Sequence, residues 1–127
     1  MKTSDFNTVE EALEDIKQGQ IVIVCDDESR ENEGDLIFAA SLTTAAKINF
    51  LAKEARGLIC VALDEQRVED LNLPMMVQKN DGRLQTAFTV SVEVKKGTTT
   101  GISASDRALT ALALADPKVK ADDFISP

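Results

Sequence analysis

The sequence predicts a single domain of the α/β class, in a layered α+β arrangement where a mixed β-sheet is flanked by helices. Three observations lead to this prediction. Segments with helical spacing of apolar residues alternate with short runs rich in β-branched residues. The chain has 127 residues, 43% of them hydrophobic, which is enough for one core. No internal repeat, low-complexity tract or linker divides residues 1–127.

The first expected element is a helix that begins after Thr8. Thr8 and Glu11 have the spacing of a capping box, in which each side chain accepts a hydrogen bond from the other residue's backbone amide. Gly19 is suited to end this helix in a left-handed conformation. Helical spacing puts four apolar residues on one face. They are Val9, Ala12, Leu13 and Ile16.

Four apolar runs have the length and composition of β-strands. Residues 20–25 and 58–63 are continuous and rich in branched side chains, which predicts strands buried on both faces. Residues 36–40 are expected to form another strand. Residues 86–94 alternate apolar and polar side chains, which is typical of a strand with one polar face.

Two further helices are expected between these strands. Thr43 or Thr44 is suited to cap a helix that ends at Gly57, and Asp64 is suited to cap a short helix after the third strand. The Met75–Met76 pair that follows is more typical of core than of a cofactor contact.

The last third of the chain combines loops with one more helix. Residues 80–85 are expected to form a mobile loop, and residues 97–101 a turn-rich loop. Ser103 or Ser105 is suited to cap a helix that Pro117 ends.

Composition and charge exclude several classes of protein. The net charge of −8 disfavours nucleic acid and anionic membranes as partners, and a shortage of aromatic residues disfavours a single-stranded nucleic-acid platform. The chain has neither a signal-like apolar segment nor an apolar run approaching about 18 residues, so a cytoplasmic protein is expected. Cys25 and Cys60 are isolated, and they are expected to be small buried side chains rather than a disulfide framework.

The chain contains no histidine. This excludes Ser-His-Asp and Cys-His nucleophile systems, zinc sites of the HExxH type and zinc fingers. A metal ion bound by these residues would have oxygen ligands, which favour magnesium, manganese or calcium.

The strongest chemical signal is the acidic segment that follows the first expected strand. Six carboxylates fall within the ten residues after Cys25, and each charge disfavours its neighbours. A hard divalent cation would offset this repulsion, and Arg30 offers a fork for a carboxylate or a phosphate. Two interpretations stand: a metal-binding loop and a solvated acidic loop. The six are Asp26, Asp27, Glu28, Glu31, Glu33 and Asp35.

A second, weaker signal is the glycine- and threonine-rich segment 97–103. Glycines, hydroxyl groups and a following helix start can hold a phosphate group, although the GxxxxGK[ST] pattern is absent. The alternative is an ordinary capped turn. Asp106 and Arg107, just beyond it, are read as a local ion pair or a structural contact.

Residues 26–35, which read Asp-Asp-Glu-Ser-Arg-Glu-Asn-Glu-Gly-Asp, closely resemble the signature of 3,4-dihydroxy-2-butanone 4-phosphate synthases. In that family an aspartate often stands where this chain has Ser29. The similarity spans essentially the whole chain, in the same order, and it implies the fold of that family. Its later segments are residues 57–60, 73–76, 86–90 and 99–107.

The resemblance implies a lyase of riboflavin biosynthesis that converts D-ribulose 5-phosphate to L-3,4-dihydroxy-2-butanone 4-phosphate and formate. It implies a magnesium or manganese ion that polarises substrate oxygens, and a homodimer with active sites at the subunit interface. Glu31 would be the metal ligand and, with Asp35, a catalytic residue. Arg30, Glu31 and Asp35 would contact the substrate. The other positions placed near the substrate are Glu28, Cys60, Thr100 and Ser103.

The resemblance also has a gap. In the family, the stretch that matches residues 123–127 leads into a Gly-His pair, and an Arg-x-Gly-His-Thr segment and a glutamate follow. These groups supply the second protein metal ligand, phosphate contacts and an acid–base group, and none stands in this chain. The chain is therefore expected to be the N-terminal part of the synthase domain, incomplete at the C-terminus and inactive alone. Two alternatives remain: a non-catalytic domain that binds metal or sugar phosphate, and a dimerisation domain.

Overall fold

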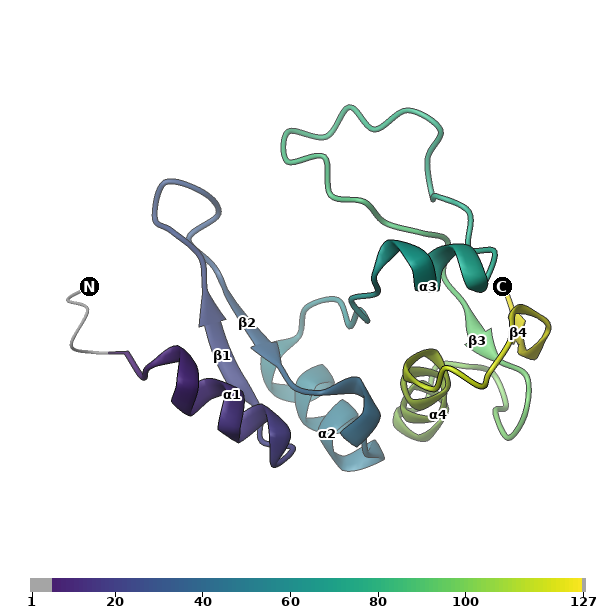
Figure 1. The fold of residues 1–127 in the computed structure, drawn as a ribbon, viewed down its shortest axis with the longest axis horizontal. Helices are drawn as coiled ribbons and strands as arrows, with labels where there is room; N and C mark the ends of the chain where they lie inside the picture. The colour runs from purple at the N-terminus through teal and green to yellow at the C-terminus, as the bar shows by residue number, and fades with distance from the viewer. Residues whose placement is uncertain (1–5, 127) are drawn as a thin grey trace.

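Figure 1 shows the chain as a computed structural model, in which residues 6–126 are described. Helices and short strands alternate along the chain, and the α/β class is confirmed. The α-helices are α1 (Val9–Lys17), α2 (Ala45–Phe50), α3 (Glu65–Asp70) and α4 (Ala104–Ala115); the strands are β1 (Val22–Cys25), β2 (Gly34–Ile37), β3 (Glu93–Val94) and β4 (Phe124–Ile125). The short helical turns are η2 (Ala40–Leu42), η3 (Leu51–Ala55, a π-helix) and η4 (Ala121–Asp123).

The described strands form two separate antiparallel pairs in place of one mixed sheet. Strand β1 pairs with β2 in the register Cys25↔Gly34, and β3 pairs with β4. Residues 58–63, expected as a strand buried on both faces, do not form a strand. A strand needs a partner for its backbone hydrogen bonds, and none of the described residues pairs with this segment.

The strands are also more exposed than their composition predicts. Ile23 on β1 is 70% exposed and Leu58 is 78% exposed, so burial on both faces is wrong for both runs. Cys25 and Cys60 are exposed as well, contrary to expectation. The reason is that a two-stranded ribbon has two open faces, and apolar composition cannot supply a layer to cover them.

The helix caps follow the sequence closely. The Thr8–Glu11 capping box forms, with Glu11 N donating to Thr8 Oγ1 at 3.2 Å and Thr8 N to Glu11 Oε2 at 2.8 Å. Gly19 has φ 77°, as a left-handed stop requires. The apolar face of this helix is largely open to solvent, since Val9 is 71% and Leu13 is 52% exposed.

The other helices begin at predicted residues. Thr44, Asp64 and Ser103 each accept a hydrogen bond from a first-turn backbone amide. Helix α2 continues through the π-helix η3 and ends at Arg56. Arg56 adopts a left-handed conformation, with φ 60°, one residue before Gly57, where the end was expected.

A wide loop joins α3 to β3 (Figure 1). It takes in most of the predicted strand at 86–94, of which only Glu93–Val94 and a bridge between Met75 and Thr89 form. Met75 and Met76 are 50% and 57% exposed, so their assignment to the core is wrong.

The core lies between α3, α4 and the β3–β4 pair. Its buried cluster is Leu71, Val94, Leu114 and Phe124. Helix α4 also contacts α2 and η2, and α1 contacts β1 at the other end of the molecule. Across the described residues, no helix has the length and apolar character needed to span a membrane.

Candidate functional site

Asp26 shapes the loop between β1 and β2. Its carboxylate accepts hydrogen bonds from Glu31 N at 2.9 Å and from Glu33 N at 2.8 Å, and its own amide donates to Glu33 O at 3.2 Å. These amide contacts, to Glu33 first and then to Glu31, hold the pKa of Asp26 below its ordinary value, with a smaller contribution from the charge of Arg30. Asp26 therefore holds the turn that presents residues 28–31.

Asp27 is a second carboxylate occupied within the loop. Its side chain accepts hydrogen bonds from the Ser29 hydroxyl and from Ser29 N, which lower the pKa of Asp27. Its carbonyl accepts a hydrogen bond from Arg30 N at 2.9 Å. Two of the six crowded carboxylates are therefore stabilised by the loop's own donors, so the crowding does not by itself require a metal ion.

Arg30 and Glu31 lie at the surface of this loop. The Arg30 guanidinium lies 3.8 Å from the Asp26 carboxylate and 4.0 Å from that of Glu31. The Arg30 side chain is 60% exposed, so these pairs are weak and leave the guanidinium accessible to a ligand. The backbone contact to Asp26 fixes the position of Glu31, whose carboxylate stays available.

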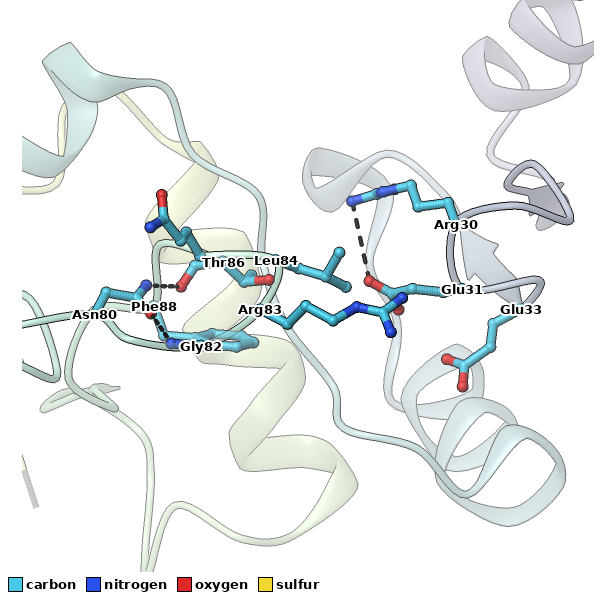
Figure 2. A pocket seen from close by; sticks show the side chains of 10 residues that line it. Arg30, Glu31, Glu33, Asn80, Gly82, Arg83, Leu84, Thr86 and Phe88 are labelled. Atoms are coloured by element: carbon cyan, nitrogen blue, oxygen red, sulfur yellow. Dashed lines mark hydrogen bonds and ion pairs between the residues drawn. The ribbon is translucent and has the colours of Figure 1, made fainter.

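Both side chains line an open hollow of about 610 Å³ (Figure 2). One wall is the hairpin loop, through Arg30, Glu31 and Glu33. The other wall is segment 80–88, including Arg83 and Phe88. Polar and apolar side chains both line this hollow, which is wide open to solvent.

The other five predicted site residues, Thr100 and Ser103 among them, lie outside the set that lines this hollow. Asp35 is on β2, paired with Val24 of β1, so it belongs to the same hairpin. Glu28 lies in the turn of the loop. Cys60 lies in the extended segment between η3 and α3. The structure therefore joins Arg30 and Glu31 at one hollow and keeps Asp35 and Glu28 on the hairpin.

The glycine- and threonine-rich loop is organised by Asp106. One carboxylate oxygen of Asp106 accepts hydrogen bonds from Thr99 Oγ1 at 2.8 Å, Gly101 N at 3.1 Å and Thr99 N at 3.2 Å. The hydroxyl of Ser103, a predicted substrate contact, caps α4 by accepting from Asp106 N at 3.0 Å. The predicted contact Thr100 is exposed in this loop. Of the two interpretations of Asp106, the structural contact is confirmed.

Gly101 is required by this arrangement. Its φ is 79°, and a Cβ atom there would lie 1.7 Å from a carboxylate oxygen of Glu93. Any other residue would therefore be strained in its backbone, and its Cβ would displace the flexible Glu93 carboxylate. The glycine lets the loop pass close to β3.

The donor set of the hairpin suits a hard cation. No group of three or more His, Cys, Asp or Glu side chains gathers within residues 6–126. Glu31 offers carboxylate oxygens at the hollow, and magnesium is commonly held by one or two protein carboxylates while it keeps several waters or substrate oxygens. Glu31 can therefore supply one ligand to a magnesium ion whose other ligands would be water or substrate oxygens.

Sequence reasoning missed the second wall of the hollow. It treated residues 80–85 as a mobile loop, whereas Arg83, Leu84 and Phe88 face the hairpin across the hollow. The one available signal was Arg83, the only cation among residues 80–88. A single cation in a polar loop does not point to a partner some 50 residues earlier in the chain.

Fold and site together define an α/β protein that presents carboxylates and arginines around an open hollow, which is a class of site suited to small polar ligands. The chain belongs to the 3,4-dihydroxy-2-butanone 4-phosphate synthase family, whose sequence model matches residues 10–127.

Curated relatives agree with this membership. A 3,4-dihydroxy-2-butanone 4-phosphate synthase of Pseudomonas aeruginosa is 53% identical over 122 residues, which are 96% of this chain and 33% of that protein. The Candida albicans synthase is 51% identical over 125 residues, 98% of this chain and 61% of that protein. A probable bifunctional riboflavin biosynthesis protein of Oryza sativa subsp. japonica, described as chloroplastic, is 53% identical over 127 residues, 98% of this chain and 23% of that protein.

Solved structures agree in fold. A 3,4-dihydroxy-2-butanone 4-phosphate synthase in complex with two magnesium ions matches with a TM-score of 0.93 and 43% identity, over 96% of this chain and 57% of that one. A cation-free synthase matches with a TM-score of 0.87 and 41% identity, over 96% and 56% of the two chains. The chain thus spans between about a quarter and three fifths of the length of these proteins.

Proposed function

We propose that this chain supplies the metal- and substrate-binding hairpin of a 3,4-dihydroxy-2-butanone 4-phosphate synthase, a lyase of riboflavin biosynthesis. The reaction converts D-ribulose 5-phosphate to L-3,4-dihydroxy-2-butanone 4-phosphate and formate. The observation that carries the proposal is the convergence of Arg30 and Glu31 on one hollow, on a hairpin held by Asp26. Family membership over residues 10–127 supports it.

The proposed role of Glu31 is to hold a divalent cation at the hollow. The magnesium-bound relative supports magnesium as that ion. When bound, such an ion would polarise substrate oxygens as a Lewis acid. Asp26 would keep Glu31 in place through its amide, so the carboxylate would enter the site already oriented.

The proposed roles of the other residues follow from their positions and from the family resemblance. Arg30, with its exposed guanidinium, would bind an anionic part of the substrate. Asp35 would accept hydrogen bonds from sugar hydroxyls and assist proton transfer. Glu28, Cys60, Thr100 and Ser103 are proposed to lie near the substrate, although Ser103 already uses its hydroxyl to cap α4.

Other features remain predictions from the sequence. These are manganese as an alternative ion, a homodimer, a cytoplasmic location, a single domain and the lack of activity of the chain alone. A role as a non-catalytic binding or dimerisation domain would be favoured only if the experiment below gives no turnover.

The test is formate release from ribulose 5-phosphate with magnesium. The chain would be assayed alone and with the part of the Pseudomonas aeruginosa relative that lies beyond the matched region. We expect formate only from the mixture, and we expect Glu31→Gln to lower its rate at least roughly 100-fold because a charged ligand is lost. Glu54→Gln is the matched control, since Glu54 is an exposed glutamate on η3 that pairs with Lys53 and is absent from the lining of the hollow.

Formate release that does not change in the Glu31 variant would contradict the assigned role. If the mixture stays inactive, the increase in Tm on adding magnesium is measured for Glu31→Gln and for Glu54→Gln. Ligand binding to the folded state raises the Tm, so this measurement detects metal binding without turnover. A rise lost only in the Glu31 variant would support a metal-binding domain without turnover.

A further inference from the structure

Residues 77–87 form a loop that projects from a short antiparallel ladder. At the base of the loop, Met76 N donates to Phe88 O at 2.9 Å, and Val90 N donates to Pro74 O at 2.9 Å. Beyond these two hydrogen bonds the chain runs out to a tip and back. Most of the residues that form the wall opposite the hairpin belong to this loop, so its shape sets the shape of the hollow.

Burial does little to hold this loop in place. Every residue from 74 to 88 is exposed. The apolar side chains within the loop are open to solvent, with Val77 at 51% and Leu84 at 42% exposure. Since little apolar surface is removed from water, packing contributes little to the stability of the loop. Hydrogen bonds must therefore supply most of what fixes its shape.

Asn80 supplies the hydrogen bond that joins the two arms of the loop. Its Nδ2 atom donates to Thr86 O at 2.9 Å, and its Oδ1 atom accepts from Gly82 N at 3.1 Å (Figure 2). Gln85 N donates to Gly82 O at 3.1 Å and closes the tip. Among the residues that the structure describes, the Asn80–Thr86 bond is the one hydrogen bond between the arms from the ladder to the tip.

The position needs a side chain that donates and accepts at the same short reach. A carboxamide does both, whereas aspartate would keep the acceptor and lose the donor, and alanine would lose both. Both polar atoms of Asn80 bond to the backbone of the loop. Although Asn80 lines the hollow, its side chain is thus already used in holding the wall.

The braced loop carries other side chains to the hollow. Arg83, Leu84 and Phe88 face the hairpin from this wall. If the loop were mobile before binding, a ligand would have to order it, and that entropy cost would weaken affinity. A loop that is already held avoids this cost.

We propose that Asn80 is a positioning residue that holds segment 80–86 as a preformed wall of the hollow before a ligand binds. This inference rests on the proposed function and adds to it the side chain that preorganises the wall. The alternative is that Asn80 contacts the substrate directly, and the experiment distinguishes the two roles.

The first test is ¹⁵N relaxation of the full chain without ligand. In the wild type we expect backbone order parameters of roughly 0.8 for Gly82, Arg83 and Gln85, and we expect Asn80→Ala to lower them below about 0.6. Asn80→Asp should lie between the two, because it keeps the acceptor for Gly82 N and loses the donor to Thr86 O.

Asp81→Ala is the matched control. Asp81 is an exposed neighbour in the same loop, and it takes no part in the brace or in the lining of this hollow. Low order parameters in the wild type, or values that Asn80→Ala leaves unchanged, would overturn the proposal. An equal fall in Asp81→Ala would also overturn it, because any change in the loop would then have the same effect.

The second test is turnover of ribulose 5-phosphate by the mixture of the chain and the added segment. We expect Asn80→Ala to raise KM roughly 10-fold, about the worth of one hydrogen bond, and to change kcat less than about twofold. A raised KM with unchanged order parameters would favour direct contact with the substrate. Lost order with an unchanged KM would overturn the link to ligand binding. An inactive mixture would count against the proposed function, and the relaxation data would still decide the role of Asn80.

Discussion

Carboxylates in this chain divide into those that the backbone already satisfies and those that it leaves free. Asp26 and Asp27 accept amide and hydroxyl hydrogen bonds, and their pKa values are lowered for that reason. Within residues 6–126, the Glu31 carboxylate has only the guanidinium of Arg30 near it, at 4.0 Å. Asp26 and Asp27 thus build the loop, and Glu31 remains available at the hollow.

Asp106 is the most heavily used carboxylate in the described chain. It is 4% exposed, and the hydroxyl of Thr99 is the main cause of its lowered pKa, followed by the amides of Thr99 and Gly101. Because the pKa is lower in the folded state, ionised Asp106 stabilises the fold. This stability is fully present above the ordinary value of 3.8 and is lost as pH falls through the lower value.

We expect Asp106→Asn to lower the Tm at neutral pH by several degrees, because a neutral amide oxygen accepts these three hydrogen bonds more weakly than a carboxylate oxygen does. The variant should also lose less of its Tm than the wild type between about pH 5 and pH 2. Thermal melts across that range check both effects. Asp81→Asn, in an exposed loop, controls for the loss of one negative charge. If the Tm of the wild type and of Asp106→Asn fell equally with pH, ionised Asp106 would not be the stabilising group.

At the scale of elements, helix α3 supplies the hydrogen-bond donor that caps the C-terminus of helix α4. Helix α4 has no basic residue in its last turn, and Asp116 is its C-cap. Arg67 of α3 donates to Asp116 O at 2.7 Å, Leu114 O at 3.0 Å and Ala113 O at 3.3 Å. The carbonyls that a helix leaves unpaired at its C-terminus are thus satisfied by a charged side chain from another helix.

We expect Arg67→Ala to lower the free energy of unfolding by about 2 kcal/mol, the range for hydrogen bonds to charged groups. Arg67→Lys should lose about half as much, because one ammonium cannot span three carbonyls. Urea unfolding measures both changes. Lys118→Ala removes an exposed cation near the same helix end and should cost less than about 0.5 kcal/mol. Equal losses for Lys118 and Arg67 would reduce the role of Arg67 to a helix-dipole effect.

The whole molecule exposes more surface than its size predicts. Its accessible surface is 9596 Å², whereas a compact monomer of 13.7 kDa exposes about 6,600 Å². Large hydrophobic side chains contribute to the excess, including Leu58 at 78% and Ile102 at 66% exposure. None of the described large side chains is less than 2% exposed. The fold therefore gains little from hydrophobic burial.

We expect the isolated chain to unfold in urea with a smaller m-value than a compact domain of the same length, because the m-value scales with the surface exposed on unfolding. It should also bind a hydrophobic dye at neutral pH. The added segment of the Pseudomonas aeruginosa relative should raise the unfolding midpoint and reduce dye binding. A cooperative transition with the m-value of a compact domain, and no dye binding, would show that the apolar surface is covered in solution.

The sequence by itself determined the local features of this protein. The caps at Thr8, Asp64 and Ser103 form as predicted because each depends on residues no more than three positions away. Residues 26–35 carry the resemblance to the family, and the family match over residues 10–127 confirms it. Composition and spacing contain this information without reference to distant residues.

Only the tertiary structure decided what each segment packs against. The predicted burial of Ile23 and Leu58 is wrong, because burial needs a covering layer and apolar composition alone does not supply one. The structure also showed that Asp26 is held by backbone amides, and that segment 80–88 forms the wall opposite Arg30 and Glu31. Caps and turns are short-range interactions, whereas burial and the walls of a site depend on contacts between residues far apart in the chain.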